Sequence, residues 1–335
     1  MSISAIVPVW NGRELLARLL DSLERQTLPA AETIVVDNGS TDGAPELARS
    51  RGARVIAMGR NAGFAAAVNR GIREAGGEWI AVLNSDVELA PCYFSRLGAA
   101  LGDGDVWFAT GKILSAGDPS RIDGTFDAVC RGGVAWRVGN GCPDGTAFSQ
   151  EQSIWSAPWT AALFRAQLFG RTGLLEERFE SHYEDVDFGF RCAALGLPGR
   201  YVPGAIAWHR GSAALGRWHP DTVRRIARNQ TYLIARHYPS RLRWRWMWPI
   251  LVAHLLWGAV ALQHGTGWAW LRGKWEGRLR RQSIGVPWRT ETADRGASRQ
   301  MEVLGVLCKS GEHFIRGAPG VFWKLYFLLT PGGEK

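Results

Sequence analysis

Apolar and polar positions alternate with a short period through the first hundred residues. Compact apolar runs are separated by longer segments in which apolar residues recur at helical spacing. The compact runs are bounded by turn residues and predict strands, at 3–9, 33–36, 54–58 and 79–83. The longer segments predict helices, at 13–25, 44–50, 64–74 and 91–101. Because strands that alternate with helices form parallel sheets with right-handed crossovers, we expect an α/β fold.

The pattern weakens beyond residue 105. We expect one more strand at 106–113, a return of order at 161–164, a helix at 187–195 and a late strand that includes 201–202 and 205–208. The segment 114–156 is glycine-rich and irregular, and it predicts no particular element. The composition changes again near residue 240. We therefore expect an α/β domain at 1–240 followed by a basic, tryptophan-rich helical region at 241–335.

Charge is unevenly distributed along the chain. The formal net charge is +9, which by itself is compatible with nucleic acid, anionic lipid or a phosphorylated substrate as partner. The stretch 210–289 holds fifteen Lys and Arg against two acidic residues, so it carries +13 and the remainder carries −4. Eleven of the seventeen tryptophans lie at or beyond Trp208. The basicity is therefore a property of one region rather than of the whole fold.

The five cysteines are scattered, and none forms a C-x-x-C pair. An odd number at irregular spacing argues against both a disulfide framework and a zinc site. We therefore expect the protein to work in a reducing compartment, the cytoplasm.

Polar side chains cluster where the predicted strands end. The second strand runs into Asp37–Gly43, the third is followed by Arg60–Phe64, and the fourth by Asn84–Glu88. Ligands of open parallel sheets bind outside the carboxyl ends of the strands, so we expect these clusters to share one rim. Alone, the segment 37–43 has the sequence of an ordinary turn and helix cap. The coincidence of three clusters favours a binding site.

Acidic residues add two candidate features. Asp86 can hold Mg²⁺ or Mn²⁺, which take oxygen ligands and usually keep waters and phosphates, or it can be a solvated loop residue. Three carboxylates lie within 184–187 and repel one another unless a cation, an arginine or a proton intervenes. A helix N-terminus would also favour them. His209, which ends a predicted strand, is compatible with a core residue, a surface residue or a metal ligand.

Three common enzyme motifs are absent from the sequence. No G-x-G-x-x-G follows the first strand, and neither a P-loop nor a G-x-S-x-G elbow occurs. Six other motifs occur in order, namely Val7–Gly12, Val35–Gly43, Arg60–Phe64, Leu83–Asp86, Tyr183–Phe188 and Trp208–Ser212. With these motifs the chain resembles the family 2 glycosyltransferases of GT-A fold, especially their rhamnosyltransferase-like branch, over about residues 3–113 and 157–238. Each motif is weak alone, but the ordered set is specific.

The resemblance implies how the donor is held. Asp37 would bind the nucleotide base in a pocket to which Pro8 and Val9 contribute. Further donor contacts would come from Asn61, Asn69 and Asn84.

The resemblance also implies a metal site. Asp86 would be the carboxylate of the family's D-x-D element, with His209 as a further metal or diphosphate contact, and the cofactor would be Mg²⁺ or Mn²⁺. The sequence departs from the family pattern because the element begins with Asn84, so only Asp86 is an ionic ligand.

The catalytic base implied by the resemblance is Asp185. Glu184 and Asp187 would support it, and Arg191 would be a structural or charge partner of the acidic cluster. Asp185 would take the proton of the acceptor hydroxyl as that oxygen attacks the anomeric carbon opposite the nucleotide, which inverts the configuration. General-base assistance of this kind is typically worth about 10²–10⁴ in rate.

The C-terminal region has two interpretations. Trp246–Leu262 is nearly all apolar but only about seventeen residues long, the lower limit for crossing a bilayer. Arginines and tryptophans alternate over 241–248, which suits the headgroup zone, and Phe314–Leu329 is a second apolar candidate. The region is either a peripheral membrane attachment or a helical subdomain that covers the sheet.

The expected function is transfer of a sugar from a dTDP- or UDP-linked donor, with dTDP-rhamnose as the leading candidate, to a glycan or lipid-linked acceptor. The setting would be cell-surface polysaccharide synthesis at the inner face of the cell membrane. A sugar-phosphate nucleotidyltransferase is an alternative, but it would need a glycine-rich loop with a catalytic Lys or Arg, which residues 8–14 lack. A non-catalytic nucleic-acid-binding protein would use the Arg- and Trp-rich region but leaves the acidic rim unexplained, so we expect no nucleic-acid partner.

Overall fold

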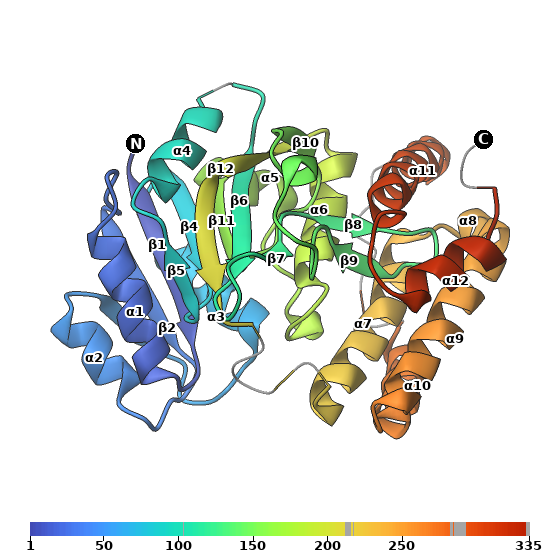
Figure 1. Ribbon diagram of the computed structural model, residues 1–335, viewed down its shortest axis with the longest axis horizontal. Coiled ribbons are helices and arrows are strands. Elements are labelled where there is room, and N and C mark those ends of the chain that lie inside the picture. Colours follow the sequence, from blue (N-terminus) through green and yellow to red (C-terminus); the bar gives the residue numbers. More distant parts are fainter. Residues whose placement is uncertain (103, 212–215, 217, 282–283, 285–292, 333–335) are drawn as a thin grey trace.

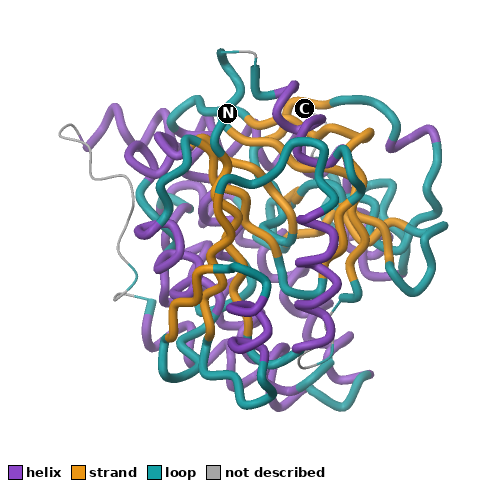
Figure 2. Tube along the Cα trace, turned by 90° about the vertical axis from the view of Figure 1, so that its left-hand side faces the viewer, coloured by secondary structure: helices purple, strands orange, loops and turns teal. Residues whose placement is uncertain are grey.

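The protein was analysed as a computed structural model, which describes residues 1–335 except 103, 212–215, 217, 282–283, 285–292 and 333–335, and only the backbone of 293–300. The described chain builds one large mixed sheet with helices on both faces (Figures 1 and 2). The strand order is β10-β12-β6-β11-β4-β1-β2-β3, with β5 paired to β12 and β7 to β6. This mostly parallel α/β architecture is the predicted one.

The first hundred residues form the elements that their apolar periodicity predicts. The strands are β1 (Ile3–Val9), β2 (Glu32–Asp37), β3 (Arg54–Ala57) and β4 (Trp79–Leu83), and β1 is parallel to both β2 and β4. The helices are α1 (Arg13–Glu24), α2 (Ala44–Ser50), α3 (Phe64–Glu74) and α4 (Tyr93–Ala100). Successive strand residues face opposite sides, so Ile6 packs on the α3 face and Val7 on the α1 face.

The second half of the sheet differs from a purely parallel pattern. The strand β11 (Ala161–Arg165) runs antiparallel between β4 and β6 (Phe108–Ser115). The late strand expected over 201–202 and 205–208 is β12 (Gly199–His209), and its pairing with β6 has a register shift between Val202 and Ile206. Helix α5 (Ala166–Thr172) follows β11, and helix α6 (Glu184–Ala194) begins three residues earlier than predicted. Glu184 and Asp185 therefore lie in its first turn.

The irregular segment 114–156 contains short elements that its sequence did not predict. It contributes β7 (Ile122–Gly124), β10 (Gln152–Ile154), a 3₁₀ turn (Thr146–Phe148) and a separate hairpin of β8 (Asp127–Val129) and β9 (Ala135–Arg137). The short strand β5 (Val87–Leu89) lies antiparallel to the end of β12. The strands β5 and β7 therefore lie at the carboxyl ends of β12 and β6, whereas β10 pairs with the beginning of β12.

The C-terminal helices pack on the sheet domain as a second layer (Figure 1). They are α7 (Pro220–His237), α8 (Ser240–Arg245), α9 (Met247–Gln263), α10 (Gly267–Arg280), α11 (Ala293–Ile315) and α12 (Val321–Leu329). Helix α11 contacts β8 and α6, and Glu312 on it forms a 2.9 Å ion pair with Arg131. In the described part of the chain, no helix is both long and apolar enough to cross a membrane. The domain boundary at residue 240 stays a prediction, since α7 before it packs against α10 after it.

Candidate active site

The carboxyl ends of β1 and β2 meet at one edge of the sheet, the lower edge in Figure 1. Val9, which ends β1, pairs with Asp37, which ends β2. The Asp37 side chain is largely buried, and its Oδ1 accepts a hydrogen bond of 2.9 Å from the amide of Ser40. Pro8 is buried beside Val9. The structure therefore brings together the three residues expected to form the nucleotide pocket.

A second loop at this edge is tied to the first by Asn38. Its Oδ1 accepts from the amide of Ala62 and its Nδ2 donates to the carbonyl of Gly63, each at 3.3 Å. Asn61 is exposed, and its Oδ1 accepts from the Gly63 amide at 3.1 Å. Gly63 has φ 90°, and a Cβ there would meet the Glu180 carbonyl oxygen at 3.0 Å. The absence of a side chain at Gly63 thus allows this second loop to contact the segment that leads into α6.

Asn69 occupies a different environment from Asn61. It is buried within α3, where its Nδ2 donates to the Leu175 carbonyl and to Glu177 Oε1, both at 2.9 Å. Its Oδ1 accepts from the Leu175 amide at the same distance. Because both ends of this amide are engaged, we expect Asn69 to hold the segment before α6, and its donor contact stays a prediction.

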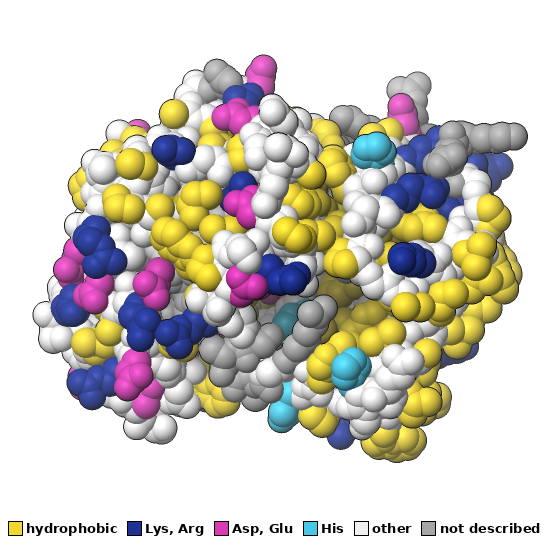
Figure 3. All heavy atoms as spheres, in the orientation of Figure 1, with side chains coloured by type: hydrophobic (Ala, Val, Ile, Leu, Met, Phe, Trp, Pro, Cys, Tyr) yellow, Lys and Arg dark blue, Asp and Glu magenta, His cyan; other side chains and the backbone are white. Residues whose placement is uncertain are grey.

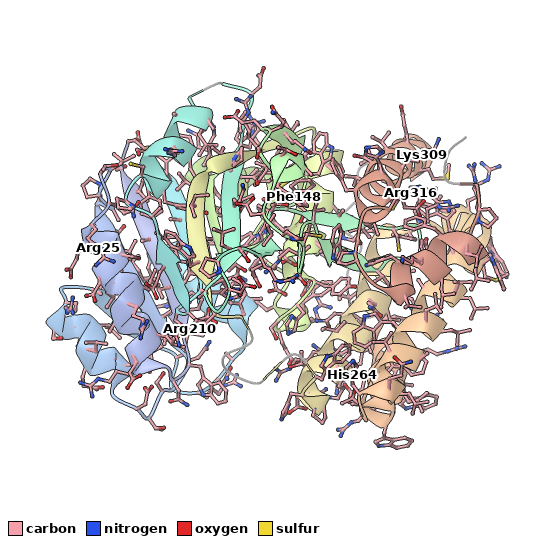
Figure 4. All side chains as sticks on the ribbon, viewed as in Figure 1. Arg25, Phe148, Arg210, His264, Lys309 and Arg316 are labelled. Atoms are coloured by element: carbon pink, nitrogen blue, oxygen red, sulfur yellow. The ribbon has the colours of Figure 1, made fainter. Side chains whose placement is uncertain are left out.

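Asp86 and His209 lie together at the expected metal position. The Nε2 of His209 is 3.1 Å from Asp86 Oδ1, and its Nδ1 is 2.9 Å from Asp123 Oδ2. Pairing of β12 with β5 holds them there, and the amide of Arg210, labelled in Figure 4, donates to the Asp86 carbonyl at 3.2 Å. Asn84 follows β4 directly, and its amide donates to a carbonyl at 2.9 Å.

This pair is compatible with a divalent cation. Burial alone would lower the pKa of His209, but hydrogen bonds to Asp123 and Asp86 outweigh it and raise that pKa to about 9. In the described chain, no group of three or more His, Cys, Asp or Glu side chains is arranged so that it could hold a metal ion. The imidazole can ligate Mg²⁺ or Mn²⁺ only when the cation displaces the ring proton that faces Asp86, and such ions fill their remaining positions with water and phosphate oxygens.

Arg137, at the end of β9, lies among three carboxylates. Its guanidinium nitrogens are 4.0 Å from Asp123, 3.5 Å from Asp127 and 3.7 Å from Asp185. The nitrogen that lies nearest Asp123, Nη1, also donates to the Thr160 hydroxyl at 3.0 Å. Through Asp123, Arg137 connects the Asp185 carboxylate to the pair described above. The predicted metal position and the predicted base therefore belong to one connected cluster.

Three carboxyl groups that feel the charge of Arg137, namely Asp127, Glu184 and Asp185, have raised pKa values. Burial, followed by the negative charge of Asp185, raises the pKa of Asp127 to about 7. Burial also raises the pKa of Asp185, against the opposing effect of Arg137. The pKa of Glu184 lies well above its ordinary value for the same reasons, burial first and Asp185 second. A carboxyl group with a pKa closer to neutrality is a better general base than a free aspartate.

Asp187 has the opposite environment. It is completely buried, with Oδ2 3.0 Å from Arg191 and Oδ1 2.7 Å from both Arg236 and His237. Burial would raise the pKa of Asp187, but Arg191, His237 and Arg236 hold it far below the ordinary range. Asp187 therefore fixes α6 against α7, and Arg191, which pairs with it within α6, donates to the Thr172 carbonyl at 2.6 Å. Their support of catalysis stays a prediction.

The turn that presents α6 is strained and held from α7. Glu180, His182 and Tyr183 all have positive φ, of 62°, 68° and 73°. The buried Asn229 side chain places its Nδ2 within 2.7–2.9 Å of three carbonyl oxygens of this turn. Strained backbone persists where its surroundings over-determine it, which is typical of active sites.

Four residues at or beside the site were not predicted from the sequence, namely Asp123, Asp127, Arg137 and Asn229. The first three lie in the irregular segment 114–156, where no periodicity marks them, and Asn229 lies in a helix that precedes the predicted boundary. Composition gives no signal for those three either, because eight of the 43 residues in 114–156 are charged, close to the 21% of the whole chain.

Known proteins resemble this chain in sequence and in fold. Residues 4–172 match the family described as Glycosyl transferase family 2. An N-acetylglucosaminyl-diphospho-decaprenol L-rhamnosyltransferase of Mycobacterium tuberculosis (strain ATCC 25618 / H37Rv) is 30% identical over 261 residues, covering 68% of this chain and 84% of that protein.

Two solved structures share the fold. GalNAc-T7 with UDP, GalNAc and Mn²⁺ superposes with a TM-score of 0.61 at 14% identity, over 77% of this chain and 51% of that one. The mannosyltransferase PcManGT of Pyrobaculum calidifontis with GDP-Man and Mn²⁺ has a TM-score of 0.51 at 18% identity, over 90% and 84%. With its GT-A fold and the matches to its sequence, the chain belongs to glycosyl transferase family 2.

Proposed function

We propose that the protein is an inverting glycosyltransferase that moves a sugar from a nucleotide-diphosphate donor to an acceptor hydroxyl. One observation carries the proposal, namely the connected series of ionic contacts from Asp86 through His209, Asp123 and Arg137 to Asp185. A single displacement needs a group for the departing diphosphate and a base for the attacking hydroxyl on opposite sides of one carbon. The two ends of this series supply them.

Asp185 acts as the base in this mechanism. Its Oδ1 accepts a 2.8 Å hydrogen bond from the Val186 amide, and Arg137 lies near Oδ2, so the carboxylate has a defined orientation. As the acceptor oxygen bonds to the anomeric carbon, its proton passes to Asp185 and the bond to the diphosphate oxygen breaks. The electron pair of that bond stays on the diphosphate, and the sugar leaves with inverted configuration.

We propose that Asp86 and His209 hold Mg²⁺ or Mn²⁺ when the donor is bound, in keeping with the Mn²⁺ named in both solved structures. The ion would supply positive charge to the departing diphosphate. On the donor side, Asp37 with Pro8 and Val9 would hold the base of the nucleotide, and Asn61 and Asn84 would face the diphosphate and sugar.

The donor sugar we propose is rhamnose, carried by dTDP, and the acceptor is lipid-linked. The name of the mycobacterial relative, an N-acetylglucosaminyl-diphospho-decaprenol L-rhamnosyltransferase, supports the choice of rhamnose and of a lipid-linked acceptor. The choice of dTDP as carrier rests on the family resemblance. We place the reaction in cell-surface polysaccharide synthesis at the inner face of the cell membrane. The five free cysteines suit that reducing side.

The test is donor binding followed by transfer. Purified protein is heated with dTDP-, UDP- and GDP-sugars, with and without Mn²⁺, and a donor at 100 times its dissociation constant should stabilise it by about 2.7 kcal/mol. The stabilising donor is then incubated with a polyprenyl-diphosphate-linked GlcNAc acceptor, and the anomeric configuration of the product is assigned by NMR. A retained configuration would overturn the mechanism, and failure of every nucleotide sugar to bind would overturn the function.

A further inference from the structure

Helices α9, α10 and α12 form a layer on the outside of the molecule, with α9 in contact with both others. The indole of Trp248 on α9 donates to the carbonyl of Leu329 at the end of α12, at 2.8 Å. Gly258 on α9 lets the Trp270 ring of α10 approach, since a Cβ there would meet that ring at 2.8 Å. These contacts place the three helices side by side as one surface.

The inner side of this layer belongs to the protein core. Val252 and Ala253 of α9, together with Trp323 and Tyr326 of α12, are buried in the same apolar cluster as Ile6 of the central sheet. These helices are therefore fixed to the α/β domain by one face. Insertion of α9 across a bilayer would require that face to leave the core.

The outer side of the same layer is apolar and uncovered. Trp248, Leu251 and Leu255 recur at helical spacing on α9 and are 57%, 47% and 56% exposed. On the neighbouring helices, Trp268 of α10 is 79% exposed and Leu328 of α12 is 73% exposed. Figure 3 shows apolar side chains gathered along the right-hand and lower-right margins, where these helices lie. Contiguous apolar surface of this kind is unusual on a monomer and marks an interaction site.

Positive charge surrounds this outer face. Arg241, Arg243 and Arg245 are exposed on α8 at one end of it. Within α8, α9, α10 and α12, which the structure describes in full, the one carboxylate is Glu276, and it is paired with Arg224 at 2.7 Å and Arg272 at 3.0 Å.

A cavity of about 720 Å³ adjoins α8 at this end of the layer. Among the residues that line it are Arg241, Arg245 and Lys309. Three cations beside exposed apolar helices match a surface whose headgroups are negatively charged and whose interior is apolar.

We propose that the outer face of α9, α10 and α12 docks on an anionic phospholipid bilayer, with the helices parallel to the membrane plane. Helix α9 has seventeen residues and is about 25 Å long, and its inner face is held by protein, so it lies in the interface rather than across it. Exposed tryptophans flanked by arginines settle at the headgroup level, where the ring is partly apolar and partly hydrated. The proposal goes beyond the transfer reaction and does not depend on it.

A second copy of the chain is a less suitable occupant. An isologous dimer would bury the same patch on both subunits, and the arginines would then need carboxylates on that patch; the one carboxylate in these fully described helices, Glu276, is already paired with Arg224 and Arg272. Nucleic acid would satisfy the arginines but would leave the leucines of α9 without an apolar partner. A bilayer satisfies both sets of side chains.

The test measures binding of the full chain to vesicles by flotation. Vesicles of phosphatidylglycerol and phosphatidylethanolamine should retain at least about ten times more protein than pure phosphatidylcholine, and high salt should reduce the difference. The triple variant Trp248→Ser, Leu251→Ser, Leu255→Ser should lose at least about tenfold in binding. The matched control is Leu195→Ser, which removes an exposed leucine (45%) at the end of α6 and should bind like the wild type.

Three results would overturn the proposal. The first is that the full chain does not float with anionic vesicles, and the second is that the triple variant floats as well as the wild type. The third is that light scattering shows a wild-type dimer which the triple substitution dissociates while vesicle binding stays unchanged. Unchanged thermal unfolding of the triple variant shows that it is folded. Because the measurement needs no donor or turnover, its failure would leave the proposed transfer reaction untouched, and the converse also holds.

Discussion

The site has a predicted donor side, which includes Asp37 and Asn61, and a predicted base side, which includes Asp127 and Asp185. Polar side chains of the donor side form hydrogen bonds mainly with nearby backbone, whereas those of the base side interact mainly with other side chains. Asp37 and Asn61 each accept from an amide two or three residues further along the chain. Asp127 and Asp185 instead share Arg137 with Asp123, and the Oδ2 of Asp127 is buried without a hydrogen-bond partner among the described residues. The donor side is thus locally preformed, and the base side depends on long-range contacts.

The difference corresponds to two chemical tasks. A nucleotide is held by groups whose positions are settled before it arrives, because preorganised groups lose little entropy on binding. A general base needs a pKa close to the working pH, which burial and neighbouring charge provide. Three carboxylates with raised pKa values around one arginine are suited to the second task and not to the first.

The variant Asp185→Asn should produce the largest difference between the two sides of the site. Removing the base should lower kcat by about 10²–10⁴ while the thermal shift with the stabilising donor stays unchanged, since the donor side is built separately. The control is Asp37→Asn, which should weaken the donor-induced shift. Wild-type turnover of Asp185→Asn would show that another group takes the proton.

Asp187→Ala should have the largest effect on stability. It leaves Arg191, Arg236 and His237 buried without their common anion, which should lower the free energy of unfolding by about 3–5 kcal/mol. The wild-type pKa is depressed in the folded state, so this contribution is complete above the ordinary aspartate pKa of about 4 and is lost as the pH falls below it. Urea unfolding at pH 7 and at pH 3.5 measures both effects, and equal stability of the variant at pH 7 would contradict the assignment.

The variant Arg137→Gln tests whether Arg137 sets the pKa of Asp185 on the base side. Arg137 lowers the pKa of Asp185, so its loss should raise that pKa further and move the acidic limb of the kcat/KM profile to higher pH. A shift of one pH unit corresponds to about a tenfold loss on the acidic side. Arg137→Lys should shift the limb less because it keeps the charge. A uniform loss at every pH would indicate a structural role only.

Asn84→Asp should have the smallest effect, on the donor side. It restores a second carboxylate beside Asp86 and should tighten the apparent affinity for Mn²⁺ by about two- to tenfold, at most about 1.4 kcal/mol. The readout is the Mn²⁺ concentration that gives half of the donor-induced thermal shift. A variant with unchanged Mn²⁺ dependence would place the metal away from this position.

Much of the donor side was predictable from the sequence. The four parallel strands and their crossover helices follow from local apolar periodicity, and polar residues that directly follow a strand must lie at its carboxyl end. The base side was predictable only in part. The carboxylates at 184–187 are visible as a cluster, but their different environments are not, since Asp185 faces Arg137 and Asp187 faces Arg191, Arg236 and His237.

The C-terminal region shows the same division. Its composition predicts helices with both apolar and basic character, but two interpretations fitted it equally. The structure shows that the helices pack on the core by one face and leave large apolar side chains exposed on the other. A hydrophobic stripe in a sequence does not reveal which of its residues a neighbouring helix will cover.

The sequence by itself determined the α/β class, the family resemblance, the rim of the sheet and the acidic cluster, because these depend on residues close together in the chain. Only the tertiary structure decided that Arg137 and Asp127 surround Asp185, that Asn69 and Asp187 are engaged in the interior, and that α9 is apolar on two faces. The physical reason is distance along the chain: β9 and α6 are separated by more than forty residues, and no local pattern encodes which charges will meet after folding.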